Sequence, residues 1–415
     1  MKIDVTNRKE RTLFILMLGA LTMLGPMAVD LYLPALPAIA QAMEEPLSKI
    51  QFTLSAYIIS FAFGQLIYGP ISDRFGRQKI ILLGIIFFFI TSLASALSSN
   101  AMQLSIIRIL QAMSGAAVMV TIPAMVNDLF PKKDSAKALS SILLVMVIAP
   151  LVAPILGGQI LKFMNWQALF LFLAVLSALI FFLAAIFIPE TLPEDRRQAF
   201  TIHHVSLNYL NILTNKNAMG CILSNSFFFA GMFAFISGSP FVYIKLFGIK
   251  PEYYGFLYGA NILAIAVANI TNLKLINQFK LFNILRSGSL IASAAGIIVL
   301  LNVKTGFGGL LGIILPIMLY AASMGLTSPN SNALALAQFP NSAATANAVF
   351  GALRFSFGGL ASAIVGYFND GTALPMATVI ATCGILSFIP LLLVKHHPTA
   401  IGDNDKHIKR DPAIE

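Results

Sequence analysis

The sequence predicts an all-α membrane protein with twelve transmembrane helices in two six-helix bundles. The chain of 415 residues is 58% hydrophobic and only 11% charged, whereas soluble domains average about 25% charged residues. Apolar runs of about 20 residues recur along nearly the whole chain, and each is long enough to cross a bilayer core of about 30 Å. Lysine and arginine are alternately frequent and rare in the gaps between these runs, as expected of a chain that crosses a membrane repeatedly.

The first predicted bundle, residues 12–188, follows a short polar N-terminus, residues 1–11. Its six spans are Thr12–Leu33, Ile50–Tyr68, Ile80–Leu97, Met102–Val126, Ala138–Leu161 and Trp166–Ile188. The second helix is expected to end at Gly69-Pro70, because glycine permits backbone geometry that other residues resist and proline has no amide proton. The charged stretch that follows predicts a tight turn before the third span.

The second predicted bundle, residues 218–394, comes after the longest hydrophilic gap in the chain. That gap, residues 189–217, is rich in charged residues and predicts a linker between two halves. The six spans beyond it are Ala218–Ile244, Tyr253–Leu273, Ser287–Val303, Phe307–Ser328, Ala343–Tyr367 and Pro375–Val394. The polar tail, residues 395–415, gives no sign of a further folded domain.

Lysine and arginine indicate which side of the membrane each gap faces. Most of the 27 positive residues lie at the two ends of the chain and in one alternate set of gaps. The other set holds only Lys49, Lys162, Lys245, Lys250 and Lys304. Because cytoplasmic loops are enriched in these residues, both termini and the linker are expected in the cytoplasm. The omission of one helix would scramble this ratio, so the pattern supports an even number of spans.

The N-terminus also permits a second interpretation, a cleaved signal peptide. A positive segment, residues 8–11, precedes an apolar run, and Ala38-Ile39-Ala40 mimics a signal-peptidase site. The run is too long for a signal peptide and contains Asp30, so an uncleaved first helix is favoured.

Three ionisable residues, Asp30, Arg108 and Arg354, lie inside predicted spans. Placing each of these side chains in the membrane costs about 2.5–3.5 kcal/mol on insertion scales, so each is expected to have a functional or structural role. Asp30 lies about one turn from the outer end of its span, and Arg108 about two turns in from the same side. We expect these two to pair, with a proton on Asp30 releasing Arg108. For Asp30 the alternatives are a solvated residue at the outer interface or a partner that merely holds the first helix in place. Arg108 could instead be a packing strut, and Arg354 could line a cavity or brace its helix.

The segment Gly69–Lys79 resembles motif A, the loop signature between the second and third spans of major facilitator superfamily (MFS) transporters. The resemblance implies a conformational gate formed by Gly69, Asp73, Arg74, Gly76 and Arg77. In that gate Asp73 and Arg77 help to latch the two halves. The corresponding second-half loop, residues 269–286, keeps three positive residues but has no clear Gly-Asp-Arg core, so the role would rest on the first copy.

Two further segments resemble MFS motifs. Residues 108–117, which include Gln111, are similar to motif B of proton-coupled members, and residues 149–158 are similar to motif C, which marks exporters that work by antiport. The second of these carries Pro150, Pro154, Gly157 and Gly158. Physically, the prolines kink a helix and the glycine pair lets a neighbouring helix approach closely. A kinked packing helix with no link to transport direction is the alternative.

The run Asp30-Leu31-Tyr32-Leu33-Pro34 resembles the Bcr/CflA group of drug-resistance transporters, as do residues 237–243 and 353–355. The resemblance implies drug:proton antiport across the bacterial inner membrane, with Asp30 and Arg108 as coupling residues. The proton gradient would supply the energy, without a cofactor, to a monomer in the lipid bilayer. A small, amphipathic drug or metabolite is expected in a cavity between the halves, where the candidate lining residues are Tyr32, Gln111, Phe233 and Arg354.

The sequence shows no enzymatic motif. It lacks a Walker loop, a nucleophile elbow, HExxH and a metal-ligand set. Cys221 and Cys383 lie in apolar segments and are expected to be packed thiols. The net charge of +10 is no nucleic-acid footprint, because the positive residues lie in short gaps rather than on a basic helix face. Two other functions remain open: a proton-coupled importer or dedicated metabolite exporter of the same fold, and a polytopic receptor or channel.

Overall fold

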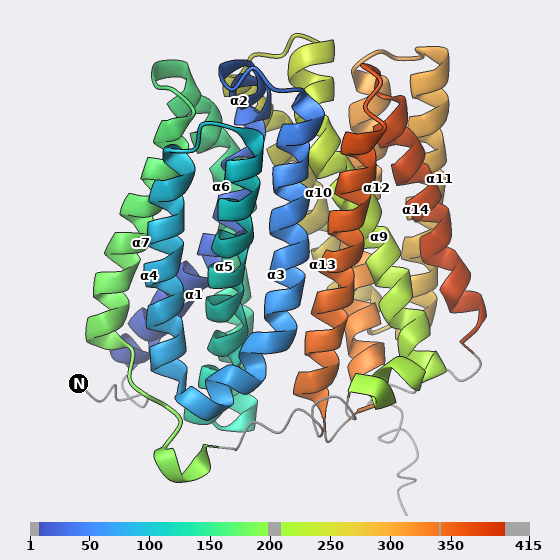
Figure 1. The fold of residues 1–415 in the computed structure, drawn as a ribbon. Coiled ribbons are helices and arrows are strands. Elements are labelled where there is room, and N and C mark those ends of the chain that lie inside the picture. The colour runs from blue at the N-terminus through green and yellow to red at the C-terminus, as the bar shows by residue number, and fades with distance from the viewer. Residues whose placement is uncertain (1–7, 198–208, 340–341, 395–415) are drawn as a thin grey trace, which may run out of the picture.

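The computed structural model describes residues 8–197, 209–339 and 342–394. Within these ranges the chain is helical and contains no strand. Twelve of the described helices are long and apolar enough to cross a membrane, which confirms the predicted fold class. Figure 1 shows the helices side by side, with the start of α1 (Arg8–Asp30) and the end of α14 (Leu374–Leu392) on the same side of the molecule. We call the opposite side the outer side.

The first half of the chain contributes six of these spans. The first consists of α1, a 3-10 turn, η1 (Leu33–Ala35), and a short helix, α2 (Leu36–Ala42). The other five are α3 (Leu47–Phe75), α4 (Arg77–Ala96), α5 (Ala101–Leu129), α6 (Lys132–Phe163) and α7 (Gln167–Phe187). In this half α5 packs against α3 and α4, while α1 packs against α6.

The second half follows the linker, whose described start contains a 3-10 turn, η2 (Glu194–Arg196). Its helices are α9 (Lys216–Pro240) with a π-helical continuation, η3 (Phe241–Leu246), then α10 (Pro251–Leu275), α11 (Leu281–Thr305), α12 (Leu311–Leu336), α13 (Ala343–Tyr367) and α14. Here α9 packs against α13 and α14, and α11 against α12 and α14. The halves meet along two seams, α3 with α13 and α6 with α10.

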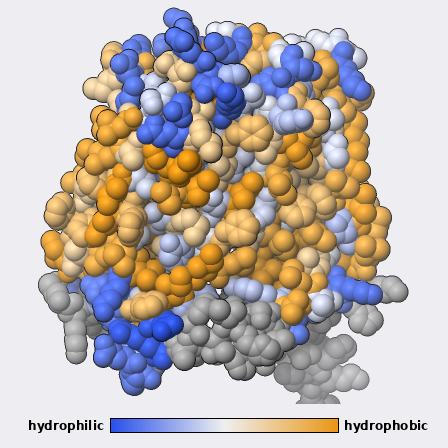
Figure 2. Space-filling view, viewed as in Figure 1, coloured by the Kyte–Doolittle hydropathy of each residue, from blue (hydrophilic) through white to orange (hydrophobic). Residues whose placement is uncertain are grey.

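The surface of the molecule suits a bilayer. Figure 2 shows a broad hydrophobic band between two more hydrophilic ends. Large apolar side chains are exposed on the flanks of the helices, among them Leu144, Phe182, Val267 and Leu301. A helix satisfies most of its backbone hydrogen bonds within itself, which is the condition for crossing hydrocarbon. Cys221 and Cys383 are buried free thiols, as predicted.

The second span does not end at Gly69-Pro70, as predicted, but continues as α3 through Pro70 to Phe75. A proline inside a helix cannot donate to the carbonyl four residues earlier, here that of Leu66. The hydroxyl of Tyr209 donates to this oxygen at 3.0 Å, so the carbonyl still has a partner. The helix ends instead at Gly76, whose φ of 96° is rarely adopted by residues with a side chain.

The first span is longer than predicted. α1 ends at Asp30, but the chain stays helical through η1 and α2, so the apolar segment reaches Ala42. Asp30 therefore lies well inside the span, and only 5% of its surface is exposed. The alternative of a solvated acid at the outer interface is wrong.

Candidate functional site

Asp30 makes its hydrogen bond across the two halves of the protein. The hydroxyl of Tyr258, on α10, donates to Oδ1 of Asp30 at 3.1 Å. Both side chains are buried. The ring of Tyr258 is held by stacking against Phe235 of α9 and Tyr254 of α10, with ring centres 6.1 Å and 6.0 Å away. An acid at the end of α1 is thus tied to a rigid aromatic group of the other bundle.

Arg108, on α5, is fully buried and is held mainly by aromatic rings. Its guanidinium carbon lies 4.2 Å from the ring centre of Tyr57 and 4.9 Å from that of Tyr32. One terminal nitrogen donates to Oε1 of Gln111 at 2.7 Å, and Gln111 in turn donates to Ser92 at 2.8 Å. The other terminal nitrogen and Nε of Arg108 have no hydrogen-bond partner in the described chain.

The predicted ion pair between Asp30 and Arg108 is wrong: the described residues contain no such pair within 4.0 Å. Instead the acid faces Tyr258, while the guanidinium lies over the ring of Tyr32, two residues after the acid. The two charges are therefore neighbours in the same region with separate partners. Since cations bind aromatic faces favourably, ring contacts replace the missing counter-ion of Arg108.

The α6 glycines set how closely the neighbouring helices approach this region. A Cβ atom added to Gly157 would meet the carbonyl oxygen of Leu31, directly after Asp30. One added to Gly158 would meet the carbonyl of Pro251, at the start of the helix that carries Tyr258. The close approach expected of the glycine pair is present, because the segment after α1 and the start of α10 both lie against α6. Pro150 and Pro154 lie in the same helix, which continues through both of them.

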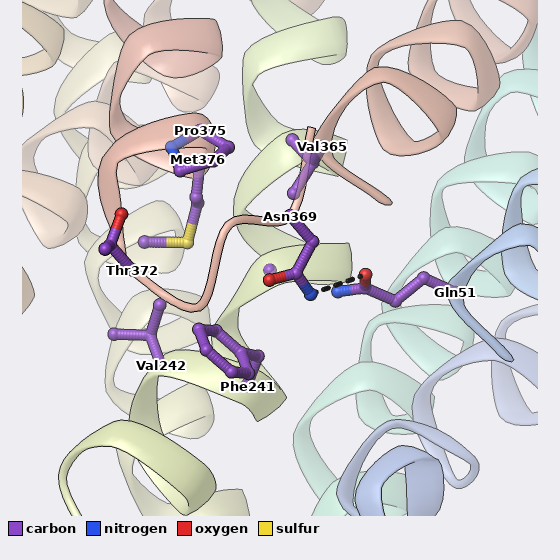
Figure 3. A pocket seen from close by; sticks show the side chains of 9 residues that line it. Gln51, Phe241, Val242, Val365, Asn369, Thr372, Pro375 and Met376 are labelled. Atoms are coloured by element: carbon purple, nitrogen blue, oxygen red, sulfur yellow. Dashed lines mark hydrogen bonds between the residues drawn. The ribbon is translucent and has the colours of Figure 1, made fainter. Parts of the chain in front are cut away.

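The outer side of the molecule is closed by polar contacts between the halves. Gln51 of α3 donates to the backbone carbonyl of Ser237 at 3.0 Å and accepts from Asn369 at 3.4 Å. Figure 3 shows this second bond beside a small pocket where α3, the end of α9 and the loop before α14 meet. Ser55 donates to Ser362 at 3.0 Å a turn further in.

The motif A residues form a network on the other side. Arg77 binds Asp73 at 2.5 Å, Asp128 of α5 at 3.2 Å and the hydroxyl of Ser72 at 2.6 Å. Its backbone N–H donates to Glu190, at the start of the linker, at 2.9 Å. Gly76 lies beside the same carboxylate, Arg74 stacks over Phe75 at 5.3 Å, and Gly69 faces α5. These partners belong to the first half and the linker, so the contacts of the described residues do not include the expected latch between the halves.

Arg354 lies in the middle of α13 within a second aromatic cluster. Its guanidinium carbon is 4.6 Å from the ring centre of Phe229 and 4.9 Å from that of Phe355. Phe355 also contacts Phe233 of α9 at 6.1 Å and Phe61 of α3 at 5.1 Å between ring centres. The four predicted cavity residues therefore divide into two groups: Tyr32 and Gln111 adjoin Arg108, whereas Phe233 adjoins Arg354.

Sequence reasoning missed Tyr258, Gln51, Phe61 and Glu190. Gln51 carried a signal, because an uncharged polar side chain inside an apolar span needs a partner. Tyr258 and Phe61 carried none, since the chain has 33 phenylalanines and 10 tyrosines and most of them face lipid or core.

These features define a class of protein, a polytopic membrane transporter of two helical halves with a buried acid between them. The chain belongs to the Major Facilitator Superfamily, whose model matches residues 18–363. It is 32% identical to a bicyclomycin resistance protein homolog of Haemophilus influenzae, over 93% of this chain and 96% of that one. It is 27% identical to multidrug resistance protein D of Escherichia coli, over 94% and 98%.

The fold is also that of solved MFS structures. The inward-open xylose transporter XylE of Escherichia coli superimposes with a TM-score of 0.72 at 15% identity, over 94% of this chain and 97% of that one. At this identity the likeness concerns the fold alone.

Proposed function

We propose that the chain is a proton-coupled exporter of the Bcr/CflA type, which carries small amphipathic compounds out of the cytoplasm by alternating access. Relatives named for bicyclomycin resistance and multidrug resistance support this assignment. The proton gradient supplies the energy, and the protein works as a carrier without a cofactor and without catalysing a reaction. It acts as a monomer in the bacterial inner membrane, with both termini and the linker in the cytoplasm.

One observation carries the proposal: a buried carboxyl group in the first half bonds to a hydroxyl of the second half on the closed outer side. Burial of an ionisable group within a membrane span is costly and marks a functional group. The bond from Tyr258 to Asp30 at 3.1 Å also depends on the relative position of the halves, because the two residues lie on α10 and α1. Protonation of Asp30 and the conformation of the protein are thereby linked.

The link has a direction. A hydrogen bond to an ionised group is stronger than one to a neutral group. The bond from Tyr258 is therefore strongest to the deprotonated carboxylate, which is the form expected after a proton has left to the cytoplasm. Reopening to the outside breaks the bond and leaves Asp30 ready to receive a proton. Substrate drives the opposite movement only through a different affinity for the two arrangements.

Everted membrane vesicles test the proposal directly. With the lumen acidified, addition of bicyclomycin should release protons from vesicles that contain the wild-type chain and from those with Asp370→Asn. Asp370 is a suitable control because it lies in an exposed loop and bonds to Thr372. Asp30→Asn should release none. Accumulation of bicyclomycin by the wild type without proton release would refute antiport, and lack of accumulation would refute export of this compound.

A further inference from the structure

Arg354 is a charge without a counter-ion at the seam between the halves. The described residues give it no ion pair and no hydrogen bond, and its Nε is buried. Its side chain is only partly buried, although it lies in the middle of α13 and faces Phe229 of α9. The lipid-facing side of α13 is marked instead by Leu360 and Ile364. The guanidinium thus lies among aromatic rings at the seam, with no charged partner among the described residues.

Aromatic rings connect this charge with Arg108 of the other half. Tyr57, which lies under Arg108, stacks on Phe61 with ring centres 6.3 Å apart. Phe61 then meets Phe355 across the seam at 5.1 Å, and Phe355 lies under Arg354. A row of rings therefore runs from one guanidinium to the other at the middle depth of α3 and α13. Both guanidinium groups keep nitrogen atoms without partners.

We propose that this row, with Arg354 as its polar anchor, is a substrate site for aromatic compounds that carry a hydrogen-bond acceptor and no positive charge. The inference rests on the export function proposed above and names one class among its substrates. A guanidinium donates hydrogen bonds in a planar fork that matches carboxylates and other oxygen acceptors. The flanking rings offer faces on which an aromatic ligand stacks.

The charge balance excludes cations. The membrane-spanning helices of the described chain hold two buried or partly buried arginines in this row, and Asp30 is occupied by Tyr258 rather than by either arginine. A cationic ligand would meet two like charges at low dielectric, where repulsion is strongest. An anion or a neutral acceptor meets unpaired donors instead.

Two dyes with one skeleton test this preference. The methyl ester of fluorescein is an anion at alkaline pH, and the methyl ester of the parent rhodamine is a cation with the same ring system. Binding to the purified full-length protein is measured by fluorescence polarisation in detergent, where no proton gradient exists. We expect the anion to bind at least about tenfold more tightly than the cation. The anion accepts a hydrogen bond from the charged guanidinium and the cation does not, and the loss of one such bond weakens binding by about tenfold or more.

Variants assign the preference to Arg354. Arg354→Gln should remove it, and Arg354→Lys, which keeps the charge without the planar fork, should retain part of it. Arg286→Gln is the matched control, because that arginine also stacks on a ring, Phe388 at 5.6 Å, but at an exposed position away from the seam. An unchanged preference in Arg354→Gln would overturn the assignment.

The wild type alone is decisive if the glutamine variant does not fold. Equal binding of the two dyes, tighter binding of the cation, or no binding of either would each overturn the substrate class. Such a result would not bear on the export function itself, which is tested separately by proton release on addition of bicyclomycin. A preserved preference for the anion without any proton release would support this site and refute antiport.

Discussion

Replacing Tyr258 with phenylalanine removes the hydroxyl that joins the two halves of the protein at Asp30. The bond is 3.1 Å long and both residues are buried, so water does not replace the lost donor. A hydrogen bond to a charged group contributes about 1.5–3 kcal/mol. The outer-closed arrangement should lose about that much relative to the outer-open one, which raises the open population by about tenfold or more.

The populations are measured from distances between two spin labels on the outer side. Lys49, at the start of α3, and Lys250, just before α10, are exposed and belong to different halves. Labels are attached to cysteines at these positions after Cys221 and Cys383 have been replaced by alanine. At alkaline pH, Tyr258→Phe should increase the population with the longer distance.

Tyr254→Phe is the control, because that hydroxyl lies on the same helix but bonds to Ser239 of the same half at 2.8 Å. It should leave the distances unchanged. At acid pH, where Asp30 is neutral, the bond contributes only about 0.5–1.5 kcal/mol, so the effect of Tyr258→Phe should shrink. Identical distance distributions in the two variants at alkaline pH would show that the Asp30 bond does not hold the outer side closed.

Two pairs of glycine variants, each a test and a control, probe the packing. Gly158→Ala places a Cβ against the backbone carbonyl at the start of α10 and should destabilise the protein by about 1–3 kcal/mol, measured by thermal unfolding. Gly69→Ala is the control and should not destabilise it, because no atom lies closer than 3.9 Å to the added Cβ. Equal melting temperatures would contradict the close approach. Gly76→Ala places a side chain at a backbone conformation that costs about 1–3 kcal/mol, and its Cβ also collides with Glu190. Gly371→Ala, at a φ of 81° in open space, should cost less, and a larger loss there would refute the role of Glu190.

The spans themselves were predictable because hydropathy is a local property of the chain. The predicted bounds of α13, Ala343–Tyr367, are those observed. The predicted helix ends were wrong where a residue far away in the sequence changes the outcome that the local sequence favours. Pro70 reads as a helix end, yet the carbonyl that it frees is satisfied by Tyr209, 143 residues away. Asp30 appeared close to the end of its span because that span was predicted to end at Leu33, whereas η1 and α2 extend it to Ala42.

The sequence by itself determined that the chain crosses a membrane and which three charged side chains lie deep within its spans, because the cost of placing a charge in hydrocarbon depends on the residue and the length of its apolar surroundings. Only the tertiary structure decided what those charges contact. Asp30 meets Tyr258, 228 residues away, and Arg354 meets the ring of Phe229 on another helix. Such contacts depend on how two bundles face each other across a seam, and no periodicity along a single helix encodes that arrangement.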